Sequence, residues 1–399
     1  MNSADHLTEL ANASVPIENA FEDAEYEARL AKVRAGMHSA ELDILLVTTP
    51  PNICYLTGYD AFGVGRFTCL LLPRDGGAEI FLPSLELPQA FVTGRMGSIT
   101  SYEWYEVNGI ADRLATLLTN LEMHSKRVGV EAKRSFFSVD MFEKLKTRLP
   151  EAQFRDGSDV IPNVRLIKSP AEIDYMRRAA VVTRAGIDAS ISAIGEGKTD
   201  NDVASAGYGA MVGAGGEFFS CQPIVAAGYR SGLYHATFKR TTLKAGEPII
   251  LEYGGCYQRY TTPLMRTAVI GNPSATVRRL ADAVIGTLNL VIENVKPGRT
   301  AHDVAKAASK GMASLGPDVS FHGGYGYSVG LGFPPTWDEG LITIAAGVDQ
   351  VLRPGMTFHL PISCRLPGRC GVALSETIVV TETGNEVLSI SKRRDVVVV

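Results

Sequence analysis

Hydrophobic and polar positions along the first part of the chain follow two different patterns. Residues 25–37 and 110–121 repeat apolar side chains at helical spacing, which predicts two helices. Short apolar runs at 42–47, 67–72 and 79–82 predict strands, and the first of them ends at a Thr-Thr-Pro-Pro turn. Strands that alternate with helices over about 150 residues predict an α/β domain.

A domain boundary is predicted just before a strong helix start. Ser169 is a candidate N-cap, Pro170 stands at the first helical position, and Glu172 can complete a capping box. We therefore divide the chain into residues 1–160 and residues 161–399.

The second part has long helices interleaved with strands of the kind that form hairpins. The helix that starts at Ser169 ends at Gly195, and Asp200 is the predicted cap of the next helix. This arrangement favours an α+β domain. Helices are predicted up to residue 211 and at 274–295 and 300–315, and strands at 248–253, 267–270, 357–360 and 373–380.

Composition and charge exclude several classes of protein. The 399 residues are 45% hydrophobic and 21% charged, which is typical of a soluble globular protein. A net charge of -4 argues against nucleic-acid binding, because neutralising phosphates requires a surplus of Lys and Arg. No stretch approaches the ~18 apolar residues of a membrane span, and residues 1–12 lack a basic start and an apolar run, so we expect a cytoplasmic protein. The 6 cysteines have no paired spacing and are interpreted as free thiols.

Five ordered motifs are similar to those of the creatinase/prolidase/methionine-aminopeptidase group. The resemblance implies an α+β fold, in which a "pita-bread" catalytic domain follows a smaller α/β N-terminal domain. It also implies a homodimer that acts on a small molecule. The motifs are VRLIKSPAE (164–172), LEYGGCYQRYTTPLMRT (251–267), GYSVG (326–330), PGMTF (354–358) and SETIVV (375–380). Members of the group have a turn at the position of GYSVG.

The residues at the group's metal-binding positions do not suit a metal. Metal-dependent members hold two ions with two Asp, one His and two Glu. The matching positions here carry, in the same order, Glu252, Pro263, Tyr327, Pro361 and Glu376. Proline has no side-chain donor atom, and a lone Tyr is a poor ligand for a divalent ion. The resemblance therefore implies this fold without a metal or another cofactor.

Two branches of the group work without a metal, and the chain resembles both. FPPTW (333–337) and RYTTPLMRT (259–267) are similar to the ectoine-hydrolase branch, although Thr261 replaces a His there. Phe62 and Arg66 are faintly similar to creatinase, whose matching loop reaches the active site of the partner subunit. The expected activity is hydrolysis of a C–N bond in a small cationic or zwitterionic amidine-like compound, with ectoine or hydroxyectoine first. The alternatives are a guanidino acid as substrate, a peptidase similar to Xaa-Pro peptidases, and a non-catalytic binding protein.

His235 is the first candidate for catalysis, because it matches the position of the catalytic His of creatinase. An imidazole titrates near neutral pH, so it can take a proton from water and return it to a leaving nitrogen. The alternative is a loop His that is hydrogen-bonded to the backbone.

Glu252 and Glu376 each interrupt an apolar strand. A buried carboxylate is costly unless it is paired, and a planar amidinium could be that partner. One of the two could also be a nucleophile. The alternative is an internal ion pair with Arg266 or Arg259, which we favour less for Glu376 than for Glu252.

The remaining candidates have weaker support. For Arg266, structural pairing is favoured over binding a substrate carboxylate. Tyr327 could orient substrate or water, and Trp337 could contact a cationic ligand through its ring. His322 is a possible second acid or base, with a structural role favoured.

Overall fold

The structure is a computed structural model that describes residues 3–60, 65–106, 108–133, 136–389 and 395–399. It divides into two compact units, one up to Arg165 and one from Leu166 to Val399. The boundary that the sequence predicts after residue 160 falls at the start of α7 (Val160–Arg165).

The first unit is an α/β domain around one mixed sheet, as the alternating pattern predicts. Its six strands follow the order β4-β3-β2-β1-β5-β6, and β1 pairs antiparallel with β2 but parallel with β5. Apolar side chains of the strands pack against α5 and α6. The strands are β1 (Ile44–Val47), β2 (Cys69–Pro73), β3 (Glu79–Pro83), β4 (Ser98–Tyr102), β5 (Arg127–Val130) and β6 (Gln153–Asp156). The helices before α7 are α1 (Ser3–Asn12), α2 (Asp23–Ser39), α3 (Pro50–Thr57), η1 (Ser84–Glu86), α4 (Leu87–Thr93), α5 (Ile110–Asn120) and α6 (Val139–Arg148).

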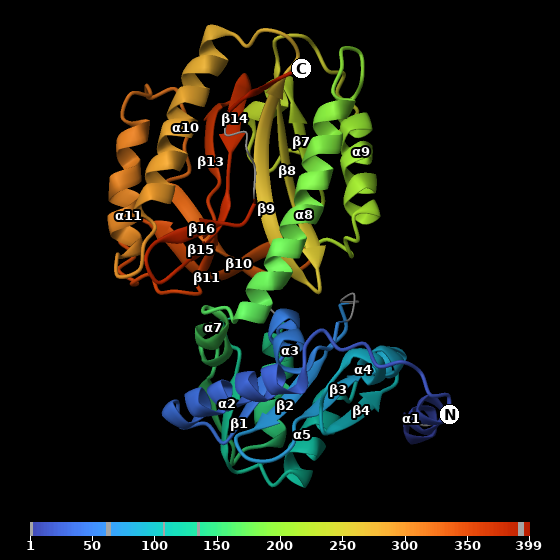
Figure 1. The fold of residues 1–399 in the computed structure, drawn as a ribbon. Helices are drawn as coiled ribbons and strands as arrows, with labels where there is room; N and C mark the ends of the chain where they lie inside the picture. Colours follow the sequence, from blue (N-terminus) through green and yellow to red (C-terminus); the bar gives the residue numbers. More distant parts are fainter. Residues whose placement is uncertain (1–2, 61–64, 107, 134–135, 390–394) are drawn as a thin grey trace. The chain divides into compact units, whose positions relative to one another are not determined.

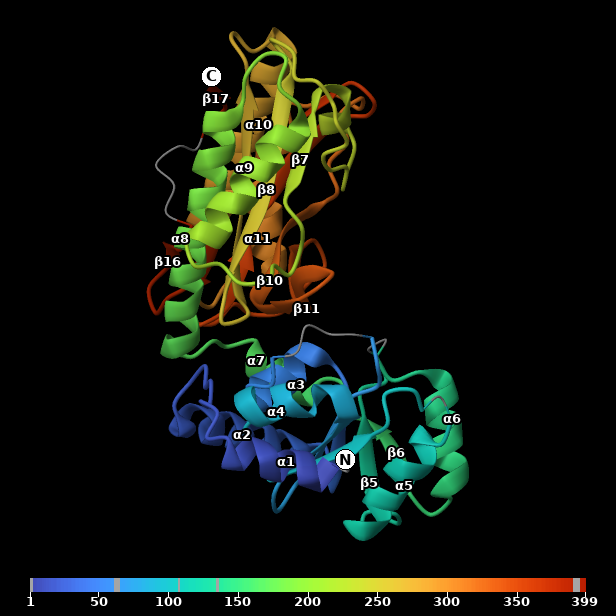
Figure 2. The same ribbon diagram turned by 90° about the vertical axis from the view of Figure 1, so that its right-hand side faces the viewer.

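The second unit has the pita-bread fold, in which helices cover a long curved sheet. The strands follow the order β16-β15-β12-β10-β9-β8-β7, with β11 added to β10, β17 added to β9, and β13 paired with β14. Helices α8 and α9 lie together on one side, and α10 and α11 on the other (Figures 1 and 2). The helical elements are α8 (Pro170–Ala193), α9 (Asp200–Gly213), η2 (Gly228–Gly232), α10 (Ala275–Asn294), α11 (Ala301–Ala308) and η3 (Ser309–Met312). The strands are β7 (Ile224–Ala227), β8 (Pro248–Tyr257), β9 (Tyr260–Val269), β10 (Gly324–Phe333), β11 (Thr336–Ala345), β12 (Thr357–His359), β13 (Ile362–Leu366), β14 (Cys370–Leu374), β15 (Thr377–Val380), β16 (Asn385–Val387) and β17 (Val397–Val398).

The helix starts of this unit are set by capping side chains. The predicted capping box of Ser169 and Glu172 is present at the start of α8. The prediction for α9 is wrong by one residue, because Thr199 is the N-cap and forms a capping box with Asp202. Asp200 is instead fully buried and accepts hydrogen bonds from the backbone of the segment that follows His235.

The β8–β9 hairpin decides which side chains share a face. Its turn is Gln258-Arg259, with both residues at positive φ, as a tight two-residue hairpin turn requires. The register that follows places Glu252 opposite Met265 and Leu251 opposite Arg266. Since successive side chains alternate between faces, Glu252 and Arg266 leave the hairpin on opposite sides.

The GYSVG motif does not form a turn. It lies inside β10, where Tyr327 pairs with Thr343 of β11 and His359 of β12.

Among the helices within the described ranges, none combines the length and the apolar character needed to cross a membrane.

Candidate active site

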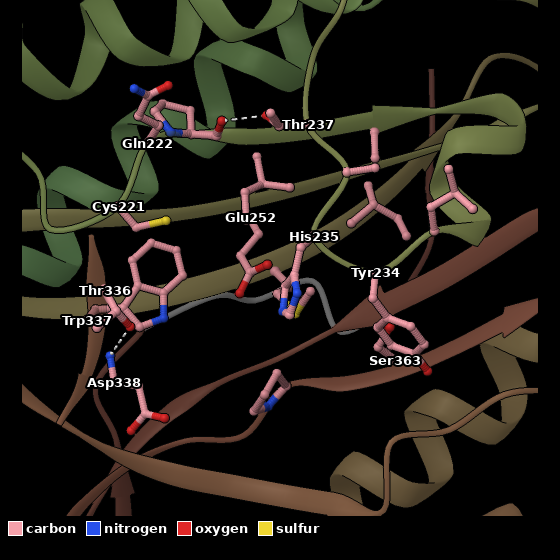
Figure 3. Close-up of a pocket in the computed structure, with 18 of the residues that line it drawn as sticks. Cys221, Gln222, Tyr234, His235, Thr237, Glu252, Thr336, Trp337, Asp338 and Ser363 are labelled. Atoms are coloured by element: carbon pink, nitrogen blue, oxygen red, sulfur yellow. Dashed lines mark hydrogen bonds between the residues drawn. The ribbon is translucent and has the colours of Figure 1, made fainter. Parts of the chain in front are cut away.

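A cavity of about 660 Å³ lies within the second unit. Its walls come from β8 and β9, from the segment before β7, from the loop after η2, from the start of β11 and from β13 (Figure 3). Most of the lining surface is apolar, although many of the lining residues carry a polar group: Cys221, Gln222, Tyr234, His235, Thr237, Glu252, His322, Tyr327, Thr336, Asp338, Ser363 and Arg365, with the indole of Trp337 beside them. The sequence therefore identified five lining residues, namely His235, Glu252, His322, Tyr327 and Trp337.

Glu252 is the acidic group at the base of the cavity. Hairpin register places it on the same face as Ile250 and Met265, which also line the cavity. Within the described part of the chain its carboxylate has neither a hydrogen bond nor an ion pair. Burial raises the pKa of Glu252 to about 7, although the positive charge of Arg365 lowers it in part. A carboxyl group with this pKa can exchange a proton near neutral pH.

Arg365 provides a positive charge in the same cavity as Glu252. It is not among the candidates identified from the sequence. It interrupts the apolar strand β13 and is only 5% exposed, and it lines the cavity. The signal that drew attention to Glu252, a charge inside an apolar strand, was present here too. The cavity therefore combines a carboxylate and a guanidinium in apolar surroundings.

His235 projects into the cavity from the loop after η2 (Figure 3). Its φ is +58°, a left-handed conformation that is uncommon for residues other than glycine. Its ring is exposed, and within the described residues it makes no hydrogen bond, so the alternative of a His bonded to the backbone is not what the structure shows. Both His235 and the Glu252 carboxylate point into the same space.

Tyr327 is held by side chains from two neighbouring strands, β11 and β12. Its hydroxyl oxygen lies 2.8 Å from Trp337 Nε1, which donates to it, and 2.8 Å from His359 Nδ1. His359 Nε2 in turn lies 2.7 Å from Ser375 Oγ, which accepts from the backbone N–H of Met265. Burial raises the pKa of Tyr327 well above its usual value, so the phenol keeps its proton.

The tautomer of His359 follows from this network. Burial lowers the pKa of His359 to about 3, so the ring is neutral. If Nε2 carried the proton, the hydroxyl hydrogen of Ser375, which is fully buried, would have no acceptor among the contacts of the described residues, whereas Tyr327 lines the cavity and can direct its hydroxyl hydrogen there. With the proton on Nδ1, Ser375 donates to Nε2, and Tyr327 accepts from both His359 and Trp337. The hydroxyl hydrogen of Tyr327 is then directed at the cavity.

His322 and Cys221 line the cavity but are poorly suited to catalysis. His322 Nδ1 accepts from the backbone N–H of Gly324, and the ring is also bonded to the backbone of Pro361. Burial lowers the pKa of His322, which keeps the ring neutral. Burial, together with the charge of Glu252, raises the pKa of Cys221 to about 11, so its sulfur stays a thiol and not a nucleophilic thiolate.

Glu376 does not line the cavity, which corrects the prediction that it contacts substrate. It is fully buried, and Arg266 Nη2 donates to its Oε1 at 2.8 Å. Ser389 Oγ donates to the other oxygen. From the sequence, an internal ion pair was favoured less for Glu376 than for Glu252. In the structure, Glu376 forms the ion pair and Glu252 does not, among the described residues. Arg266 therefore has the structural role that was favoured for it.

The two candidates from the first unit were Phe62 and Arg66. Phe62 lies outside the described residues. Arg66 is exposed, and its guanidinium lies 5.1 Å from the ring of Trp104. The homodimer in which these residues reach a partner's site stays a prediction.

The residues that match the metal-binding positions of the creatinase/prolidase group do not form a metal site here. Pro263 lies in β9 and offers only its carbonyl, which accepts from Thr377 Oγ1. Glu376 is occupied by Arg266, and Pro361 has no donor atom in its side chain. Across the described ranges, no three His, Cys, Asp or Glu side chains gather closely enough to hold an ion. These residues do not fit a dinuclear metal centre.

Comparisons with known proteins agree with the two-part organisation. The pattern of the creatinase/prolidase N-terminal domain matches residues 29–167, and that of metallopeptidase family M24 matches residues 174–382. An uncharacterised hydrolase/peptidase of Sinorhizobium fredii is 32% identical over 388 residues, covering 94% of this chain and 98% of that protein. Ectoine hydrolase of Halomonas elongata is 30% identical over 391 residues, covering 92% of this chain and 96% of the relative. The crystal structure of prolidase from Pyrococcus horikoshii has a TM-score of 0.80 at 24% identity, over 92% of this chain and 99% of that one.

Proposed function

Since the chain belongs to metallopeptidase family M24 and its cavity holds a buried carboxylate, we propose that it hydrolyses a C–N bond of a small zwitterionic amidine. The proposed reaction uses no metal ion. A cyclic amidine carboxylate such as ectoine is the first candidate substrate. The similarity to ectoine hydrolase at 30% identity supports this choice of substrate class.

The observation that carries the proposal is the state of Glu252. This carboxylate lies deep in an apolar cavity, has no counter-ion in contact with it, and has its pKa raised to about 7. A bound amidinium provides the missing partner, because its planar pair of N–H groups matches both oxygens of a carboxylate. Binding of that cation lowers the pKa of Glu252 again and keeps it ionised.

The residues around Glu252 support the following hydrolysis. Glu252 holds the amidinium, and Tyr327 donates its hydroxyl hydrogen to the reacting group. His235 takes a proton from water as the water oxygen bonds to the amidine carbon. The imidazolium then gives this proton to the departing nitrogen as the C–N bond breaks. The second proton of the former water leaves the new carbonyl oxygen for the released amine, so the products are an amide and an ammonium group. No step requires a metal ion.

The proposal is tested by proton NMR of purified protein, treated with chelator, in a mixture of ectoine, hydroxyectoine, creatine and a Gly-Pro dipeptide. We expect ring opening of ectoine or hydroxyectoine at a rate that chelator does not change. Turnover of creatine alone would assign the protein to guanidino acids. Turnover of the dipeptide only after addition of Mn²⁺, Co²⁺ or Zn²⁺ would contradict the proposal and favour a peptidase.

A second prediction concerns His235. His235→Asn is expected to lower turnover by about 10²- to 10⁴-fold, because it removes the acid/base group. Asn tolerates the left-handed conformation, so the loop and the melting temperature should stay close to the original values. Turnover is measured on the substrate identified by NMR. Activity within a few-fold of the original protein would exclude proton transfer by His235.

A further inference from the structure

The second charged group of the cavity, Arg365, is fixed in position from several sides. The backbone N–H and C=O of Arg365 both bond to Ser320. Arg365 Nη1 donates to the carbonyl of Ser231, and the ring of Tyr234 lies 5.3 Å from the guanidinium. The side chain also fills the space beside Gly371, where a Cβ atom would lie 2.5 Å from Arg365 Cδ. The orientation of the guanidinium is thus set before a ligand arrives.

Most of the hydrogen-bonding capacity of this guanidinium is unused. It has five N–H donors, and the Nε of Arg365 is buried without a hydrogen-bond partner. Within the described part of the chain, Arg365 forms no ion pair within 4.0 Å, and Glu252 influences it only through its charge. A buried cation without an anionic partner is costly, and the cost is removed when a ligand supplies an anion.

The charges around the cavity define which anion fits. Arg365 is the one Arg or Lys among the described lining residues, and Glu252 and Asp338 are acidic. The pKa of His322 is lowered, so this ring adds no positive charge near neutral pH. A dianion such as a phosphate would meet two carboxylates and only one cation. A single carboxylate forms the paired contact for which a guanidinium is suited.

We propose that Arg365 binds the carboxylate of the substrate and restricts the enzyme to amino-acid-derived zwitterions. This inference rests on the proposed function, because it places the planar cation of the same ligand against Glu252. The two fixed charges lie on different strands, β13 and β8, and the ligand bridges them through the apolar cavity. A cationic amidine without a carboxylate would leave Arg365 unpaired and would meet its repulsion as well.

The test compares two ligands that differ only in the carboxylate. They are ectoine and 2-methyl-1,4,5,6-tetrahydropyrimidine, which is ectoine without that group. Affinities are measured by calorimetry in a His235→Asn background, in which bound ectoine should be consumed at least about 100-fold more slowly. We expect ectoine to bind about 100-fold more tightly than its analogue, as a charged bidentate contact implies.

Variants of Arg365 separate a role in binding from a role in folding. Arg365→Gln should weaken ectoine binding about 100-fold and leave the affinity for the analogue unchanged or slightly higher. Arg365→Lys keeps the charge but loses the paired geometry, so an intermediate loss is expected. Arg369→Gln removes an equal charge from an exposed position nearby and should change neither affinity. The melting temperature of each variant shows whether it is folded.

Each outcome has a distinct meaning. Three outcomes would overturn the carboxylate contact. Arg365→Gln could weaken the binding of both ligands equally, or the background protein could bind both with equal affinity. The third outcome is that neither ligand binds at millimolar concentration. Carboxylate-dependent binding of ectoine without its hydrolysis by the original protein would contradict the proposed function and leave the contact with Arg365 standing.

Discussion

Glu252→Gln is expected to lower turnover by roughly 10³-fold or more and, at the same time, to make the folded protein more stable at pH 8. The loss of activity follows because Gln cannot pair as an anion with the amidinium. The gain in stability follows because Gln does not carry a charge that must be buried. A residue whose only role is to stabilise the fold would show the opposite sign.

The sign of the stability change follows from how the protonation of Glu252 depends on pH. The pKa of Glu252 is about 7 in the folded protein, against a usual value of 4.5. Between these pH values the folded state binds more protons than the unfolded state, so the free energy of unfolding decreases as the pH rises. The loss should amount to ~1–3 kcal/mol, reduced because Glu252 partly faces the open cavity. The advantage of Glu252→Gln should therefore be absent below pH 4.5 and complete above pH 7.

Two measurements check this expectation. Denaturation at several pH values gives the stability of both proteins, and kcat/KM of the original protein should rise with pH through about 7 as Glu252 ionises. Glu382→Gln is the matched control, because Glu382 is exposed in the same unit and should affect neither property. A Glu252→Gln variant that is active, or less stable at pH 8, would contradict both the role and the environment assigned to Glu252.

Arg266→Met should destabilise the second unit by about 3–5 kcal/mol, since it leaves the Glu376 carboxylate buried without its cation. Replacing both partners, as in Arg266→Met with Glu376→Leu, removes the uncompensated charge and should recover most of that loss. If Glu376 were instead a substrate contact, the single variant Arg266→Met would retain its stability and the double variant would not improve on it.

Fluorescence can follow this unit alone. The chain has 2 tryptophans, Trp104 in the first unit and Trp337 in the second. In a Trp104→Phe background, Trp337 reports the unfolding of the second unit by denaturant. The original protein, Arg266→Met and the double variant are compared at pH 7 in the same background.

Local features of the structure were predictable from sequence, because they depend on neighbouring residues. The capping box of Ser169 and Glu172 needs only a spacing of three residues, and the structure has it. The strand that carries Glu252 was also identified, although it runs to Tyr257 and not to residue 253. The loop that carries His235 was identified as well, and both residues line the cavity.

Contacts between distant segments were not predictable in the same way. Glu252 and Glu376 have the same local pattern, a carboxylate in an apolar strand, and only the fold shows that one is paired. The β8–β9 register could have separated Glu252 from Arg266, but the turn at 258–259 was not recognised. His359 was missed because its contact with Tyr327 depends on the pairing of β10 with β12, which lie far apart in the sequence.

The distribution of the three cavity groups proposed to contact the ligand also bears on chirality. Glu252 projects from β8, Arg365 from β13 and His235 from the loop after η2, so they approach the ligand from three different elements. A ligand whose carboxylate stands on a stereogenic carbon can satisfy all three in one configuration only. Its mirror image can place the carboxylate and the planar cation correctly, but it then presents the wrong side of the amidine carbon to His235. If the proposed contacts hold, the separation of these groups over three elements therefore predicts that the protein accepts one enantiomer only.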